Sequence, residues 1–234
     1  MRHTKIKRTL LGTLSVFFLA VSCSEDNGSL ELEEVNASVN LTNNSDAVII
    51  VDAVYNASDA YNNPRLLDGV DQATVDEFIE KYNLDKLSTG AKIEAANVNQ
   101  IISEVGRAYE IGLDRYIATT SYASFTKEIL LIQITGSSVP DLTKRRGFDT
   151  ISDEEQNMLL LNNAMLQEFE RRNGSQGQTR INCNGTDDPA GCIVGTWVGS
   201  TIGNAVGTSV CGPICGAVGG AIGGIIGGAI GGKE

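Results

Sequence analysis

Four cysteines near the C-terminus, Cys183, Cys192, Cys211 and Cys215, are the residues of this chain whose type and spacing could do chemistry. Thiols in an oxidising compartment pair into disulfides, whereas four thiolates around one point can hold zinc. Pairing of Cys192 with Cys211 is awkward, because a helix between them would hold them at opposite ends. The expected disulfides are therefore Cys183 with Cys192 and Cys211 with Cys215. A zinc site made of all four cysteines is the alternative.

Histidine chemistry is confined to the start of the chain. The only histidine, His3, lies in a segment that we expect to be removed on export. Since histidine is the usual general base near neutral pH and the commonest metal ligand, its loss removes Ser-His and Cys-His nucleophiles and most zinc sites. No pair of carboxylates stands out by its spacing. We expect no catalytic residue and no cofactor, and we expect that the protein is not an enzyme.

The first 22 residues have the layout of a secretory signal peptide, in which basic residues precede an apolar run from Leu10 to Val21. The run is too short to span a bilayer comfortably. The small residues before Cys23 resemble the lipobox of bacterial lipoproteins, which implies cleavage before Cys23 and acylation of its sulfur. An ordinary signal peptide with an incidental cysteine is the alternative. Ser24-Glu25-Asp26 resembles the acidic export tag of Bacteroidetes surface lipoproteins, which implies exposure at the cell surface.

The mature chain is expected to be strongly acidic. Without residues 1–22 it keeps 14 Lys and Arg against 29 Asp and Glu, a formal net charge of −15. Such a charge disfavours nucleic acid and anionic lipid headgroups as partners. Membrane attachment would therefore come from acyl chains and apolar helices. Residues 23–44, rich in Asn, Ser and Glu, are expected to form a flexible tether after the lipidated cysteine.

Helix signals dominate residues 45–172. The expected helices cover about 46–61, 72–83, 89–116, 122–135 and 152–172. Asp71 is the expected N-cap of the second helix, and Ser152 with Glu155 forms a capping box at the last. A strand is the alternative around 129–132. We predict an all-α fold, with a small helical bundle at 45–172, a linker at 173–190 and a C-terminal helical hairpin at 191–232.

The hairpin is predicted from glycines at every fourth position in a tract without charged residues. They are Gly191, Gly195, Gly199, Gly203 and Gly207 and, after a Gly212-Pro213 turn, Gly216, Gly220, Gly224, Gly228 and Gly232; a second row lies beside them at Gly219, Gly223, Gly227 and Gly231. Each interior glycine costs roughly 1 kcal/mol relative to alanine, so this hairpin should fail as a helix in water. In a bilayer, unpaired amides cost more, and glycine rows let two helices pack closely. A disordered or collagen-like tail is the alternative.

A polar row follows the glycines of the first arm, at Thr196, Ser200, Asn204 and Thr208. Such a row needs a protein partner or water, so we expect it to pack against the second arm or to line the centre of an oligomer. The second arm is expected to offer its branched side chains to lipid, at Val218, Ile222, Ile226 and Ile230. Each arm of about 20 residues reaches about 30 Å, which matches the hydrocarbon thickness.

The ten glycines in register over 191–232 resemble the glycine-zipper two-transmembrane family, the C-terminal module of outer-membrane lipoproteins related to the rickettsial 17 kDa surface antigen. The resemblance implies an envelope lipoprotein without catalytic activity. We therefore expect a non-enzymatic lipoprotein of the outer membrane that presents a helical domain. Its expected partners are membrane lipid, further copies of itself and an envelope protein. The alternative is a pore-forming or bacteriocin-like toxin whose glycine arms oligomerise in a target membrane.

Overall fold

The computed structural model describes residues 44–57, 69–88, 93–174, 183 and 187–233. These residues form eight α-helices and contain no strand, which confirms the all-α prediction. The segment around residues 129–132 lies within a helix, so the strand alternative is wrong. The predicted signal peptide, Cys23 and the tether up to residue 43 lie outside the described residues.

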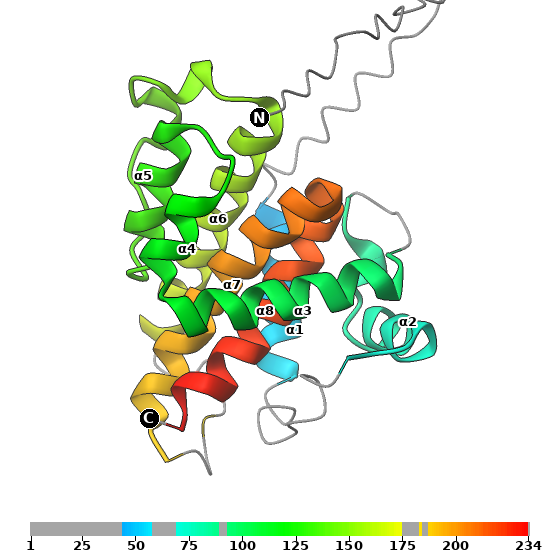
Figure 1. Cartoon of the computed structure of the whole chain (residues 1–234). Coiled ribbons are helices and arrows are strands. Elements are labelled where there is room, and N and C mark those ends of the chain that lie inside the picture. Colours follow the sequence, from blue (N-terminus) through cyan, green and yellow to red (C-terminus); the bar gives the residue numbers. More distant parts are fainter. Residues whose placement is uncertain (1–43, 58–68, 89–92, 175–182, 184–186, 234) are drawn as a thin grey trace, which may run out of the picture. The chain divides into compact units, whose positions relative to one another are not determined.

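Six helices precede the hairpin (Figure 1). They are α1 (Asn44–Asn56), α2 (Gln72–Lys81), α3 (Ala95–Ile111), α4 (Leu113–Thr119), α5 (Ser124–Gln133) and α6 (Asp153–Gly174). Short 3-10 turns lie at Leu84–Lys86, Leu142–Lys144 and Phe148–Thr150. The helix expected over 89–116 is broken in two, because Gly112 takes φ +93° and ends α3. Few residues other than glycine adopt that conformation.

One predicted helix cap is present as expected, and the other is formed only in part. The Asp71 carboxylate accepts a hydrogen bond from the Thr74 amide at 2.9 Å, as expected for an N-cap. Ser152 Oγ accepts from the Glu155 amide at 3.2 Å, which is half of a capping box. The Glu155 carboxylate does not complete the box, because it accepts instead from the Ala123 amide and from Thr126 Oγ1. Glu155 therefore joins α6 to the start of α5.

The C-terminal hairpin consists of α7 (Pro189–Cys211) and α8 (Pro213–Gly231). Asp188 caps α7 by accepting from the Ala190 amide, and each arm begins with a proline, where the missing N–H has no cost. Gly212 makes the turn with φ +80°. The Asp188 amide donates to the Gly232 carbonyl at 3.1 Å, so the open end of the hairpin is also tied.

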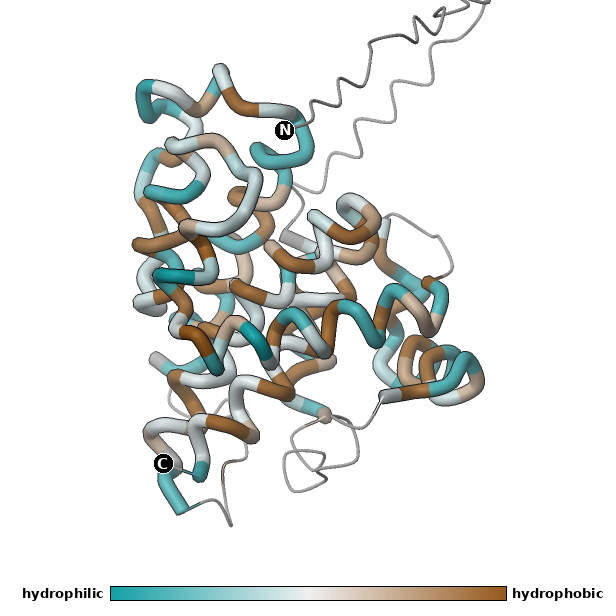
Figure 2. Tube along the Cα trace, in the orientation of Figure 1, coloured by the Kyte–Doolittle hydropathy of each residue, from teal (hydrophilic) through white to brown (hydrophobic). Residues whose placement is uncertain are grey.

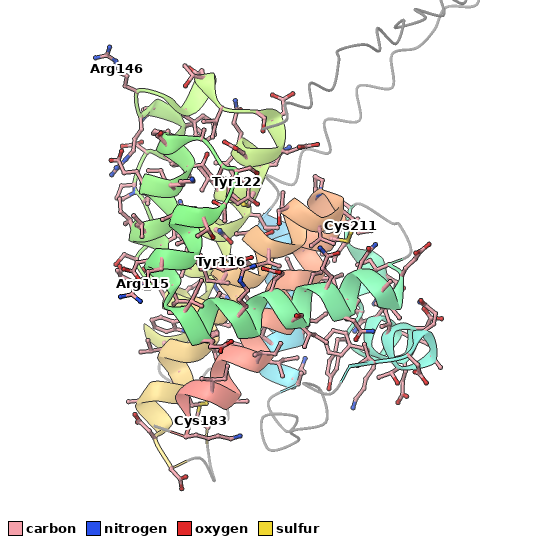
Figure 3. All side chains as sticks on the ribbon, in the orientation of Figure 1. Arg115, Tyr116, Tyr122, Arg146, Cys183 and Cys211 are labelled. Carbon is pink, nitrogen blue, oxygen red and sulfur yellow. A yellow bond between two sulfur atoms is a disulfide. The ribbon has the colours of Figure 1, made fainter. Side chains whose placement is uncertain are left out.

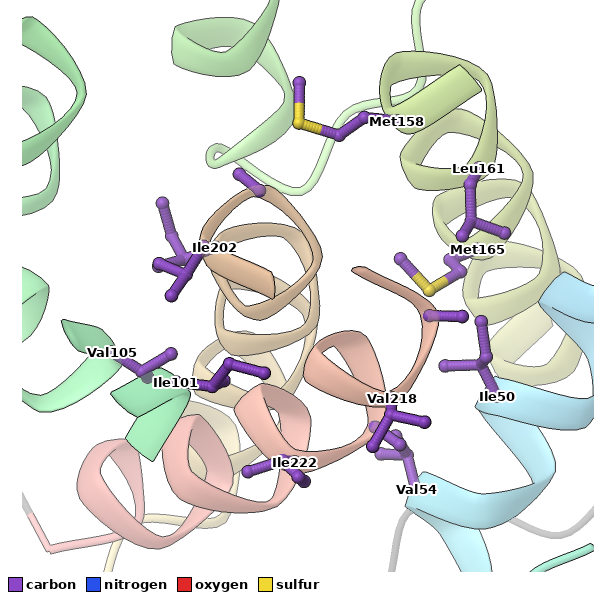
Figure 4. Packing of buried hydrophobic residues seen from close by; sticks show 14 of the residues in the cluster. Ile50, Val54, Ile101, Val105, Met158, Leu161, Met165, Ile202, Val218 and Ile222 are labelled. Carbon is purple, nitrogen blue, oxygen red and sulfur yellow. The ribbon is translucent and has the colours of Figure 1, made fainter. Parts of the chain in front are cut away.

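The hairpin lies inside the helical bundle. Figure 4 shows Ile101 and Val105 of α3 on one side of the two arms, and Ile50 and Val54 of α1 with Met165 of α6 on the other. These side chains belong to one hydrophobic cluster that includes the branched residues of α8. Along α3 the hydropathy alternates between hydrophilic and hydrophobic positions, as expected for a helix with one buried face (Figure 2).

The boundary predicted between the bundle and the hairpin therefore does not separate two cores. Residues 45–172 and 191–232 share their buried surface, because the apolar side chains of the covering helices and those of the hairpin belong to one hydrophobic cluster. The branched residues of α8 are a second correction. Of the four that were expected to face lipid, Val218, Ile222 and Ile226 are each at most 9% exposed, whereas Ile230 is only partly buried.

Candidate functional site: the glycine hairpin and its polar row

The two arms meet backbone to backbone along two glycine rows. A Cβ added to Gly199 would overlap the carbonyl oxygen of Gly223, and one added to Gly223 would lie 2.7 Å from Gly203 Cα. The same relation repeats along the pairs Gly191 with Gly231, Gly195 with Gly227, and Gly203 with Gly219. Contact this close gains dispersion energy and weak Cα–H···O bonds. We call these glycines the inner rows.

The register of α8 differs from the predicted one. The row that meets α7 is Gly219, Gly223, Gly227 and Gly231, which had been placed beside the zipper. Gly216, Gly220 and Gly224 instead meet side chains of α7, α6 and α1, because they lie about 100° further around the helix. We call Gly216, Gly220, Gly224 and Gly228 the outer groove.

The polar row of α7 packs against the second arm, one of the two predicted positions. Asn204 and Thr208 lie against Gly216, and Ser200 lies against Gly224. All four members of the row are at most 9% exposed. Thr196 Oγ1 donates to the Cys192 carbonyl of its own helix at 2.8 Å, whereas Ser200 Oγ has no hydrogen-bond partner within the described part of the chain.

A chain of buried amides connects α7 to α6 and α5. Asn204 Nδ2 donates to Asn162 Oδ1 at 2.8 Å and to the Met158 carbonyl at 3.1 Å. Asn162 in turn donates to Gln133 Oε1 at 3.3 Å, and Gln133 donates to the Leu159 carbonyl at 3.1 Å. Because all three side chains are almost fully buried, their hydrogen bonds offset a desolvation cost and fix the rotation of α7.

Two tyrosines tie the covering segments to the backbone of α7. The hydroxyl of Tyr109 on α3 donates to the Gly195 carbonyl at 3.2 Å, and that of Tyr122 donates to the Ala205 carbonyl at 2.5 Å. Burial raises the pKa of both phenols, so they stay protonated. On the opposite side, the Phe169 ring lies between Trp197 of α7 and Tyr55 of α1, with both centroid distances 6.1 Å.

An ion cluster holds α1 against α6. Arg172 contacts both Asp52 and Glu168 at 2.6 Å, and Arg171 contacts Glu168 at 2.6 Å. The hydrogen bond from Arg171, and after it the one from Arg172, hold the pKa of Glu168 below its usual range, although burial acts in the opposite direction. At its N-terminal end α1 is tied by Asp46, which accepts from the amide and hydroxyl of Ser88.

The four C-terminal cysteines lie as two pairs at disulfide distance. The Cα atoms of Cys183 and Cys192 are 6.0 Å apart, and those of Cys211 and Cys215 are 5.5 Å apart. Figure 3 shows Cys183 and Cys211 at opposite ends of the hairpin. The alternative of a zinc site made of all four cysteines is therefore wrong, and the described residues contain no group of three or more potential metal ligands.

The sequence interpretation missed Asn162 and both tyrosines as part of this site. Asn162 had a detectable signal, since it lies four residues after Met158 and three before Met165 on the buried stripe of α6. An amide at such a position needs a buried partner. Tyr109 and Tyr122 carried no comparable signal, because their acceptors are backbone carbonyls.

Among the described helices, only α8 is long and apolar enough to cross a membrane, and most of it is buried. That pattern also fits the central helix of a water-soluble bundle. α7 carries the polar row along its length. No protein-family model, curated protein or solved structure matches the chain.

Proposed function

We propose that the chain is a non-enzymatic lipoprotein of the cell envelope, anchored in the outer membrane through acylated Cys23. The helical domain, with the glycine hairpin as its core, stands off the membrane to bind an envelope partner. The observation that carries this proposal is the burial of most of the hairpin: α2 and α3 cover branched side chains of α8, and α1 covers its outer groove. Such a domain needs a separate anchor, which the lipobox-like sequence before Cys23 supplies.

The anchor is tested by comparing two full-length versions in cells. One keeps the native leader, and in the other a cleavable leader without cysteine replaces residues 1–23. The native version is expected to incorporate palmitate and to fractionate with the outer membrane. The exchanged version is expected in the soluble envelope fraction. If the exchanged version stays in the membrane and resists alkaline extraction, the hairpin itself is the anchor and the proposal is wrong.

A second candidate function, membrane insertion with pore formation, is favoured by the composition of the hairpin. Its arms lack charged residues from Ala190 to Gly232, and the charged residues of the other described helices lie outside the arms. A hairpin of this kind could leave the bundle without carrying a charge into lipid. Purified chain added to dye-filled phosphatidylcholine vesicles would release dye under this function. Under the anchored-domain function the vesicles stay intact.

A further inference from the structure

The outer groove of α8 is occupied by a matching ridge from another helix. A Cβ on Gly220 would lie 3.5 Å from Ile50 Cγ2, and one on Gly224 would lie 3.0 Å from Val54 Cγ2. Ile50 and Val54 are four residues apart on α1, as are the two glycines on α8. α1 is therefore packed as a third zipper helix, with branched side chains set into bare backbone.

α8 carries a ridge of the same form on its opposite face. Val218, Ile222 and Ile226 also repeat at every fourth position, and Ile222 lies about 200° around the helix from Gly220. In the folded domain α2 and α3 cover this ridge, and they leave an apolar cavity of about 40 Å³ against it. Figure 4 shows Ile222 and Val218 on α8 between the side chains of α3 and those of α1.

One hydroxyl of the polar row lies beside the groove without a hydrogen-bond partner among the described residues. Ser200 is fully buried and its hydroxyl points at Gly224 without a hydrogen-bond partner in the described residues. An unpaired buried hydroxyl is costly, and it gains most from a helix that brings an acceptor to this position. The groove is thus lined by bare backbone and by one hydroxyl that its present occupant leaves unpaired.

We propose that the outer groove is a docking site for a second copy of this chain. The Val218–Ile222–Ile226 ridge of the incoming α8 replaces the Ile50–Val54 ridge of α1, and a backbone carbonyl of the incoming helix accepts from Ser200. Because groove and ridge lie on opposite faces, the contact is head-to-tail and builds rings or rows of hairpins rather than closed dimers. The proposal rests on the second candidate function, since both faces are free only after the hairpin has left the bundle.

The test uses full-length mature chain, fluorescently labelled and incorporated into phosphatidylcholine vesicles, whose neutral headgroups do not repel the acidic chain. The emission of Trp197, the chain's only tryptophan, reports insertion, because it leaves its contact with Phe169 when the hairpin is released. Energy transfer between labels reports association. Under the membrane-insertion function on which this proposal rests, wild-type chains insert and associate.

One variant alters the groove, and a second serves as its control. Gly220→Ala adds a methyl group that the free domain tolerates, since the nearest atom is the flexible thioether of Met165 at 3.3 Å. In the bilayer the incoming helix has to lie closer to the groove than α1 does, because its carbonyl must reach Ser200, which α1 leaves unpaired. The added methyl group obstructs this closer approach, so the dissociation constant is expected to rise about tenfold. Gly106→Ala on α3 is the control, because a Cβ there meets nothing within 4 Å.

Ser200→Ala provides an independent measurement. It removes a hydroxyl that has no partner in the free domain, so folding stability is expected to hold while association weakens about three- to thirtyfold. Thr196→Ala is its matched control, because that hydroxyl is already bonded within α7. Docking is wrong, while insertion stands, if wild-type chains insert as single copies. The same holds if Gly220→Ala and Ser200→Ala associate like wild type and like the two controls. Chains that never insert overturn both.

Discussion

At the scale of single residues, the positions of the inner rows require glycine, because a Cβ there would meet the backbone of the other arm, which cannot move aside. Gly199 meets the carbonyl of Gly223 and the Cα of Gly227, whereas Gly106 on α3 meets nothing. Alanine favours a helix by roughly 1 kcal/mol over glycine at both positions. Any difference between the effects of Gly199→Ala and Gly106→Ala on stability therefore measures the contact between the two arms.

We expect Gly199→Ala to lower the free energy of unfolding by about 1–3 kcal/mol, because the added methyl group overpacks the arm interface. Gly106→Ala should raise it by up to about 1 kcal/mol. Urea denaturation of the two variants beside wild type measures both values. Equal effects would mean that the arms do not meet along these glycines.

The Glu168 carboxylate gives a prediction about pH. Its folded pKa lies below the usual 4.5, since Arg171 and Arg172 bind the charged form. A lowered folded pKa stabilises the fold above pH 4.5, and this stabilisation is lost as the pH falls through the folded value. Glu168→Gln should therefore be less stable than wild type by roughly 1.5–3 kcal/mol at pH 7, a cost that shrinks in acid. Urea denaturation of wild type and Glu168→Gln at pH 7 and at pH 3 measures the difference in their free energies of unfolding. A difference that does not change with pH would contradict this role of Glu168.

Residue patterns predicted the glycine contacts only in part. The period of four identified the row on α7 correctly, because that arm has one glycine row. α8 has two rows, and spacing alone cannot say which one faces α7. The choice depends on what covers the other faces, namely Ile50 and Val54 on one side and α2 with α3 on the other.

At the scale of helices, the amide chain from Gln133 through Asn162 to Asn204 orients α7 against α6. Asn204→Leu would leave Asn162 Oδ1 buried without that donor, so it should cost about 1–3 kcal/mol. The double variant Asn162→Leu/Asn204→Leu should recover part of this loss, because both amides are then gone. A double-mutant cycle by urea denaturation gives the coupling energy, and strict additivity would show that the two amides do not interact.

Helix positions were largely predictable, since capping residues and apolar spacing are local signals. Asp71 and the start of α6 at Ser152 are examples. The break at Gly112 was missed, because the apolar spacing continues through α3 and α4 and a glycine within a helical pattern need not end it. The role of Glu155 as a link to α5 depends on a contact 32 residues away, which no local pattern carries.

For the whole molecule, the environment of the hairpin is what the sequence left undecided. Glycine-rich arms were expected to need a bilayer, because their helices are unstable alone in water. The structure supplies the dry environment from its own helices, which surround the arms and leave Ser200 and Thr201 buried without hydrogen-bond partners among the described residues. The apolar stripes of α1, α3 and α6 could be recognised in the sequence. The sequence did not show that all three stripes pack against the hairpin.

Hydrogen exchange of the unacylated chain in lipid-free buffer tests this central claim most directly. If the covering helices keep α7 and α8 dry, the amides of Gly199 and Gly223 exchange among the slowest in the protein, with or without vesicles. If those amides exchange as fast as in an unfolded peptide and become protected only when lipid is added, the hairpin is not the core of this fold.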